Sequence, residues 1–361
     1  MPLVRMSPIF TQTVFTRPWA RIALLYAGAI AVGYVLSWLR VPLPWMIGPM
    51  LVAGLVSGLG FDVKVPVTTR LVGQVIVAAA VGLAFTPAAV SAVAEQIVPM
   101  VAAAILTVVA GFIVAGLLMR LTHIDVISAS LASVPGGPVE MAALASHYGV
   151  APGPVAFAQT MRIALLVLII PPALVGIAGG APDLSAVLRS DDLDLAGGGL
   201  LLAIGAAGGF VFRLVRITSP FFLGALGFSA AAAALSLPVS MPPLVVLSGG
   251  QVLLGVWLGC MFDRDMLVRS RSFIPAALVS TLVLMVLCVA MAFGISGFTG
   301  IGWQVMVLAT APGSVTEMAL TAKILQQGVA MVTAFHVVRI FILLPAAPLI
   351  FAITARLARR A

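Results

Sequence analysis

The sequence predicts an all-α integral membrane protein made of two related halves. The prediction depends on the composition, on an internal repeat and on the placement of charge between apolar segments. Of 361 residues, 62% are hydrophobic and only 8% are charged, and the mean hydropathy is +1.22. Soluble domains carry about 25% charged residues, so this chain could not cover its surface in water.

The repeat consists of four sequence blocks that recur in one register. The positions at 44–48 recur at 220–224, 73–75 at 250–252 and 133–142 at 310–319, while Arg162 matches Arg339. The spacing is 176 residues at the first block and 177 at the others, and unrelated apolar sequences would not keep so nearly the same spacing over four blocks. We therefore expect membrane repeats at 20–180 and 197–357, an acidic extracytoplasmic linker at 181–196, a cytoplasmic tail at 1–19 and a short C-terminal tail at 358–361.

Each half contains five apolar segments of about the length that a membrane-spanning helix needs, which is roughly 20 residues. They lie at 20–39, 44–60, 71–92, 97–119 and 151–177, and at 198–215, 220–237, 243–261, 273–296 and 328–355. A sixth segment in each half, at 126–146 and 303–325, carries a Pro-Gly motif and a glutamate. These two segments either re-enter from one face or cross as broken helices.

The basic residues between the segments indicate how the halves are oriented. If the two motif segments do not cross, each half crosses five times, the second half is inverted, and both termini are cytoplasmic. That topology places 14 bases in the cytoplasm and only 3 outside, as the positive-inside rule requires. If the motif segments cross, the division becomes 10 against 7. Inverted repeats with broken segments are a recurrent plan of secondary transporters.

Apart from charges in loops or near segment ends, four charged residues remain inside the apolar segments, and they form two equivalent pairs. They are Glu140 and Glu317, together with Arg162 and Arg339. A charge at membrane depth costs at least about 2.5–3.5 kcal/mol. Such residues therefore mark either a binding site or a structural network that holds the broken helices together, and both interpretations stay open for the glutamates.

The repeated motif is typical of a helix that stops and starts again inside the membrane. Proline lacks the N–H and glycine tolerates unusual dihedral angles, so 135–137 and 312–313 should interrupt the helix. New helices are expected at N-caps Gly137 and Ser314, the latter with an S-x-x-E capping box. Helix N-termini attract anions, which predicts a site for a small anion at Gly136, Gly137, Gly313 and Ser314.

Further polar residues accompany this predicted site. Gln159 and His336 precede the two arginines by one helical turn, and we expect all four side chains to bind the substrate. Glu140 and Glu317 are expected to bind a coupling ion or to cap their helices. Gln74 and Gln251 follow glycines within apolar helices and either line the site or join helices through hydrogen bonds.

The repeated P-G-x-x-x-E-M segments, with 44–49 and Gly73-Gln74, resemble the bacterial AbrB-type membrane protein family, in its duplicated-domain group. The resemblance covers nearly the whole chain. Members carry labels such as regulator or ammonia monooxygenase. The resemblance implies a multi-pass protein of the bacterial plasma (inner) membrane and supplies no substrate.

The residues exclude several classes of function and favour one. Three scattered histidines do not form an oxygenase metal site, no hydrolase or Walker motif is present, and no loop could hold a nucleic-acid-binding domain. We therefore expect no enzyme, no metal, no cofactor and no nucleic acid. The sequence predicts a secondary transporter of a small anionic solute, in a lipid bilayer and compatible with a homodimer. The alternative is a membrane-bound sensor or regulator that transports nothing.

Overall fold

The computed structural model describes residues 18–61, 63–177, 194–217, 219–262, 264–269, 271 and 273–358. Most of the predicted N-terminal tail, the predicted linker up to residue 193 and the last three residues lie outside this part of the chain. Every regular element within it is helical.

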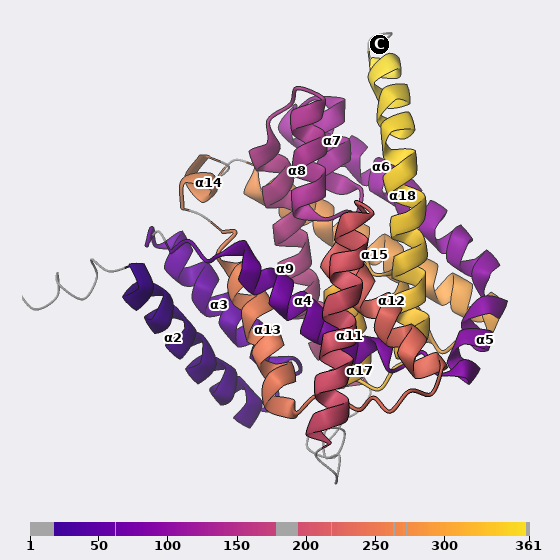
Figure 1. Cartoon of the computed structure of the whole chain (residues 1–361). Helices are drawn as coiled ribbons and strands as arrows, with labels where there is room; N and C mark the ends of the chain where they lie inside the picture. Colours follow the sequence, from indigo (N-terminus) through magenta and orange to yellow (C-terminus); the bar gives the residue numbers. More distant parts are fainter. Residues whose placement is uncertain are drawn as a thin grey trace, which may run out of the picture.

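The helices follow one another along the chain without an intervening sheet (Figure 1). The first half contains α2 (Pro18–Trp38), α3 (Pro44–Gly58), α4 (Val67–Gly82), α5 (Pro87–Glu95), α6 (Ile97–Thr122), α7 (Val126–Ser133), α8 (Pro138–His147) and α9 (Pro152–Ile177). The second contains α11 (Leu195–Leu214), α12 (Pro220–Ala234), α13 (Leu244–Gly259), α14 (Arg264–Arg269), α15 (Ile274–Thr299), α16 (Trp303–Thr310), α17 (Val315–Ile324) and α18 (Val329–Ala358).

Several helices at equivalent positions of the two halves have the same lengths. α3 and α12 both have 15 residues, α4 and α13 have 16, and α6 and α15 have 26. The residue before α3, Leu43, and the residue before α12, Ser219, both adopt a left-handed conformation, with φ of 55° and 49°. The sequence repeat is therefore matched by a repeat of local structure.

Both motif segments are interrupted at the Pro-Gly motif. α7 and α16 each have 8 residues, and α8 and α17 each have 10. The chain becomes extended at Val134 (ψ 128°) and at Ala311 (ψ 134°), because each residue precedes a proline, which disfavours the helical conformation. Each interruption exposes a helix C-terminus and, a few residues later, a helix N-terminus.

Some of the helices are long enough to cross a membrane and others are too short. In the described part of the chain, five helices are long and apolar enough to cross a membrane, namely α2, α6, α9, α11 and α15, or six if α4 and α5 together form one span. The segment at 71–92, expected from the sequence to be one of the uninterrupted spans, is bent. α4 and α5 meet at 90°, because Pro87 begins a new helix that the Thr86 side chain caps. The ten crossings expected from the sequence stay a prediction.

The short helices pack together reciprocally. α3 contacts α13, and α4, the equivalent of α13, contacts α12, the equivalent of α3. α3 also packs on α2 as α12 packs on α11. At these last two contacts a Cβ on Gly48 would lie 2.7 Å from the backbone nitrogen of Gly33, and one on Gly224 would lie 2.2 Å from the backbone oxygen of Gly208. The repeated glycine thus lets two helix backbones touch.

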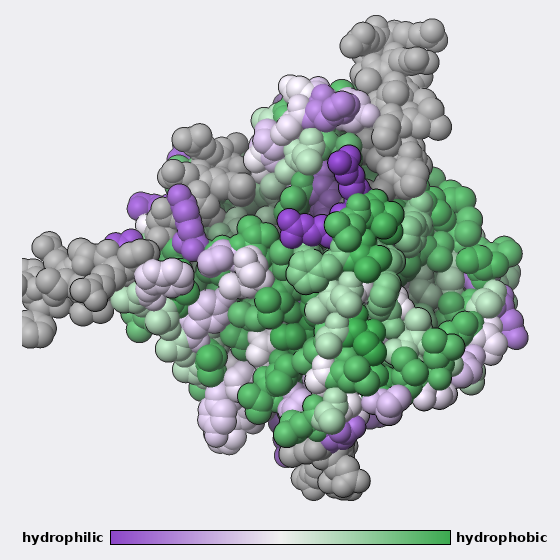
Figure 2. Space-filling view, viewed as in Figure 1, coloured by the Kyte–Doolittle hydropathy of each residue, from purple (hydrophilic) through white to green (hydrophobic). Residues whose placement is uncertain are grey.

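The surface of the protein is largely apolar. Large hydrophobic side chains are exposed on many helices, including Leu214, Val245 and Phe298, which are 82%, 83% and 95% exposed. Figure 2 shows this apolar face with hydrophilic atoms gathered in a hollow between α8 and the neighbouring end of α11. Such a surface is stable only in contact with lipid, so the chain is a multi-pass membrane protein.

Candidate functional site

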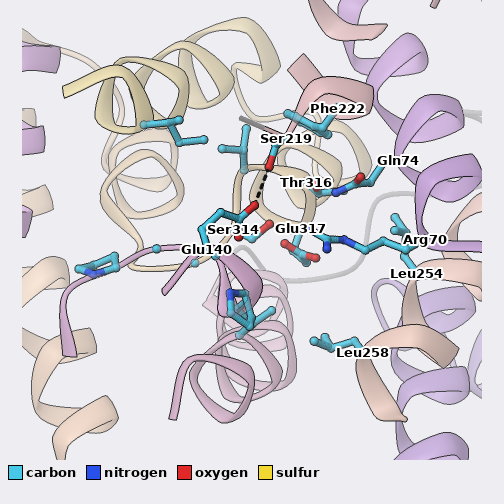
Figure 3. Close-up of a pocket in the computed structure, with 18 of the residues that line it drawn as sticks. Arg70, Gln74, Glu140, Ser219, Phe222, Leu254, Leu258, Ser314, Thr316 and Glu317 are labelled. Atoms are coloured by element: carbon cyan, nitrogen blue, oxygen red, sulfur yellow. Dashed lines mark hydrogen bonds between the residues drawn. The ribbon is translucent and has the colours of Figure 1, made fainter. Parts of the chain in front are cut away.

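The hollow leads to a cavity of about 100 Å³ in which the two interrupted segments meet. Residues 135–138 and 313–317 both line it, so the start of α8 and the start of α17 face one space. The N-terminal part of α4, the N-terminus of α12, the C-terminal part of α13 and α18 complete the wall. Figure 3 shows the polar side chains of this wall converging.

Glu140 lies in the first turn of α8, where Gly137 is the N-cap and Pro138 the first helical residue. The Ser219 hydroxyl, at the N-terminus of α12, donates a hydrogen bond of 3.1 Å to Glu140 Oε1 (Figure 3). Glu140 Oε2 is buried and has no hydrogen-bond partner. A carboxylate oxygen in that state leaves a place for a proton or a cation.

Glu317 occupies the equivalent position in the first turn of α17 and is only 8% exposed. Its Oε2 also lacks a hydrogen-bond partner. Ser314 is the N-cap as expected, but its side chain accepts no capping hydrogen bond. The hydroxyl half of the predicted capping box is therefore wrong, and Ser314 lines the cavity.

Arg162 lies in α9 and Arg339 lies in α18, and each contacts the interruption in its own half of the chain. Arg162 is 2% exposed and donates hydrogen bonds to the carbonyl oxygens of Ser133 (3.2 Å), Ala132 (3.5 Å) and Gly136 (3.4 Å). Arg339 donates to the carbonyl oxygens of Ala311 (2.8 Å) and Gly313 (2.5 Å). These carbonyls have lost their helical donors, so each guanidinium stabilises a broken helix end where a cation is favoured.

Gln159 adds to this arrangement in the first half. Its Nε2 donates to the carbonyl oxygens of Leu131 (2.6 Å) and Val134 (2.9 Å), and its Oε1 accepts hydrogen bonds from Arg162 and from the Gly136 N–H. In the second half the fully buried His336 takes its place, so the two interruptions are held by different side chains.

The cavity includes eight of the predicted site residues and excludes four. Gly136, Gly137, Gly313, Ser314, Glu140, Glu317, Arg339 and Gln74 line it. Arg162, Gln159, His336 and Gln251 are not part of its wall. No ion pair joins either motif arginine to Glu140 or Glu317, so the expected network of paired charges is absent among these four described residues.

Arg70 is a cavity residue that sequence reasoning placed among the cytoplasmic loop bases. It lies in the first turn of α4, and its guanidinium is 4.4 Å from the centre of the Trp257 ring. Figure 3 shows Arg70 extending toward the Glu317 carboxylate. A sequence signal existed, since Arg70 precedes the repeated Gln74 by four residues and so lies on the same face of its helix.

No group of three or more His, Cys, Asp or Glu side chains capable of holding a metal ion occurs in the described residues. The cavity instead offers amide, hydroxyl, carboxylate and guanidinium groups beside two helix N-termini. Such a wall is suited to holding a small polar or charged molecule.

The fold and the cavity define a multi-pass helical membrane protein with a polar site between two interrupted helices. A family model described as transition state regulatory protein AbrB matches residues 45–355, and the chain belongs to this family. It is similar to "Putative regulator AbrB" of Escherichia coli strain K12, with 25% identity over 92% of this chain and 95% of that protein. It is also similar to "Uncharacterized protein YhjN" of Bacillus subtilis strain 168, with 24% identity over 91% of this chain and 90% of that protein.

Proposed function

We propose that the protein is a secondary transporter of a small anionic solute, which binds in the cavity between the two interruptions. The observation that carries the proposal is that two helix N-termini from different halves of the chain face one polar cavity in an otherwise apolar protein. Interrupted helices of this kind form the substrate sites of many transporters. Uninterrupted apolar helices would make the protein at least as stable, so stability does not explain the interruptions.

The proposal includes an inverted topology, with repeats at 20–180 and 197–357 and both termini in the cytoplasm. The loop bases favour it, and the matched helix lengths and reciprocal packing are those that a two-fold relation between the halves would produce. Both similar proteins come from bacteria, which supports a location in the bacterial inner membrane. Cysteines introduced at positions 193 and 268 should label from opposite sides of the membrane; labelling from one side would refute the inversion.

Attraction for the anion comes from Arg70 and from the N-termini of α8 and α17. Arg162 and Arg339 have most of their hydrogen bonds directed at backbone carbonyls, so we assign them the task of holding the interruptions in shape. Arg70 has its guanidinium at the cavity, and Gln74 and Thr316 add polar atoms to the wall. A solute carboxylate beside Arg70 would receive charge-assisted hydrogen bonds.

The coupling ion is assigned to Glu140 and Glu317. Each has a buried oxygen without a hydrogen-bond partner, and both carboxylates face the same cavity as the solute. A bound proton or sodium ion would remove the cost of these unpaired oxygens. Glu140→Gln and Glu317→Gln should therefore leave solute binding detectable and abolish its dependence on pH or sodium.

The decisive experiment is uptake into liposomes that contain only this protein. Radiolabelled small mono- and dicarboxylates would be tested with imposed proton or sodium gradients. Arg70→Gln should abolish uptake, whereas Arg120→Gln, which changes an exposed base at the end of α6, should not. Uptake of no anion from the panel, or equal uptake by both variants, would refute the proposal.

A sensor or regulator is the second candidate function, because the matching family model and the similar Escherichia coli protein carry regulator in their names. A sensor would bind a solute in the same cavity and move none. Solute-dependent thermal stabilisation of the purified protein, together with impermeable liposomes, would establish this function in place of transport.

A further inference from the structure

The wall of the cavity is asymmetric, and this asymmetry contrasts with the repeat. One part of the wall, here called the open side, is made by Arg70, Ser219, Phe222, Leu254, Trp257 and Leu258. The centre of the wall, formed by the two interruptions with Glu140 and Glu317, is common to both halves. The repeat therefore provides a second set of residues at the equivalent places on the opposite side of the glutamates.

That second set does not line the cavity. It belongs to a hydrophobic cluster that also contains Phe222, Leu254 and Leu258, and its members are at most 2% exposed: Leu43, Met46, Val77, Ala80, Val81 and Leu247. The contacts between helices show the same difference. α17 packs against α4, whereas the equivalent pair, α8 and α13, makes no comparable contact. The two sides of the site thus have equivalent helices in different arrangements.

A polar contact holds the packed side together. Lys323, in the last turn of α17, donates a hydrogen bond of 2.9 Å from Nζ to the carbonyl oxygen of Ala80 near the end of α4. Its equivalent on the open side is Ser146, which is exposed and bonds to Ala142 within its own helix. Lys323 therefore joins the motif helix α17 to α4, whereas Ser146 does not join α8 to α13, the equivalent of α4.

The packed side contains one buried polar side chain, Gln251, whose surroundings are largely apolar. It is the equivalent of Gln74, which lines the cavity, and it is only 4% exposed with no hydrogen-bond partner at Oε1. An unpaired amide oxygen in an apolar cluster is costly. It would be satisfied if water or solute reached it when this side opened.

We infer that the binding site has a second mouth, now closed, which is lined by the cluster from Leu43 to Leu247 and latched by the Lys323–Ala80 hydrogen bond. Opening it would move α17 away from α4 and bring α8 toward α13, so that the solute and the two glutamates face the other side of the membrane. This inference rests on the proposed function, which supplies the reason for a site with two mouths. Arg70 has Leu247 as its equivalent, so the second mouth has no arginine at that position.

Cysteine labelling tests the second mouth without any knowledge of the solute. Val77→Cys and Leu254→Cys are equivalent positions on the closed and open sides, and each would be made in a Cys260→Ser, Cys288→Ser background. A membrane-impermeant charged maleimide should label position 254 quickly from one side and position 77 slowly from the other. Lys323→Met should raise labelling at 77 about tenfold, the population change expected from losing one hydrogen bond with a charged donor, and should lower labelling at 254.

The control is Ser146→Met, which changes the equivalent residue on the open side and should alter neither rate. The inference is overturned if position 77 labels from the same side as 254, or if folded Lys323→Met protein labels like its parent. If Lys323→Met does not fold, slow labelling of position 77 in the parent decides: labelling from the opposite side supports the second mouth, and none over hours refutes it. A protein that labels as expected but moves no solute would refute transport and leave the second mouth standing.

Discussion

The repeated glycine of α3 and α12 gives a quantitative test of the helix packing around the site. In Gly224→Ala the new methyl group would lie 2.2 Å from the Gly208 oxygen and 2.7 Å from the Gly209 nitrogen, whereas ordinary van der Waals contact begins at 3.4 Å. α11 and α12 must therefore separate by about 1.2 Å. Both neighbours are backbone atoms, so no side-chain rotation can relieve the contact.

The expected loss follows from two opposing effects. Overpacking of this kind costs about 1–3 kcal/mol or more, while replacing glycine by alanine inside a helix gains about 1 kcal/mol. Because the overlap at Gly224 is severe, we expect a net loss of about 2 kcal/mol. Gly48→Ala, where the nearest backbone atom is 2.7 Å away, should lose less.

The assay is reversible unfolding in mixed micelles with increasing dodecyl sulfate, which reports the free energy of unfolding. Gly227→Ala is the matched control, since it lies in the same helix and its methyl group would meet only Phe212 Cζ at 3.9 Å. That variant should be as stable as the parent or slightly more stable. If Gly224→Ala is as stable as Gly227→Ala, the close approach of the two backbones is not what the repeated glycine provides.

Three further predictions concern the site. Arg162→Met should lower the free energy of unfolding by about 2–4 kcal/mol, because it leaves the carbonyls of an interrupted helix without donors; unchanged stability would contradict that assignment. Gly137→Ala should fold normally yet disturb coupling, because its methyl group would overlap the flexible Glu140 carboxylate at 1.8 Å, and normal pH or sodium dependence of binding would contradict this. Arg70→Gln should weaken solute binding about tenfold or more with little loss of folded protein, as measured by isothermal titration beside size-exclusion chromatography; equal affinity would exclude Arg70 from the site.

Much of the helical arrangement could be predicted because the repeat appears in the sequence itself. The interruption at each Pro-Gly motif follows from local chemistry, since proline removes a hydrogen-bond donor and restricts the residue before it. The N-cap at Gly137 followed from the same rule. The bend between α4 and α5 was missed because apolar residues continue through it, and the break depends on Thr86 and Pro87, which are weak signals inside a hydrophobic run.

The location of the candidate site could be predicted from the sequence, but the contacts and the role of each residue could not. Charge inside apolar sequence identified Arg162 and Glu140 without showing what they contact. The partners of Arg162 are backbone carbonyls, which are present at every residue and leave no mark in a sequence. Arg70 was assigned to a loop because the first turn of α4 lies near the boundary between a charged loop and an apolar segment, where sequence alone places helix ends least well.

The one-sided cavity also has a consequence for the membrane potential. Polar solvent that reaches the two glutamates from the Arg70 side carries the electrical potential of that side with it, so most of the voltage must fall across the packed cluster between Leu43 and Leu247. An elementary charge that passes this cluster exchanges about 2.3 kcal/mol with the field for every 100 mV. In the transport cycle proposed above, the balance of charge between Arg70, Glu140 and Glu317 would therefore determine whether the membrane voltage drives the solute, opposes it or leaves its movement unaffected.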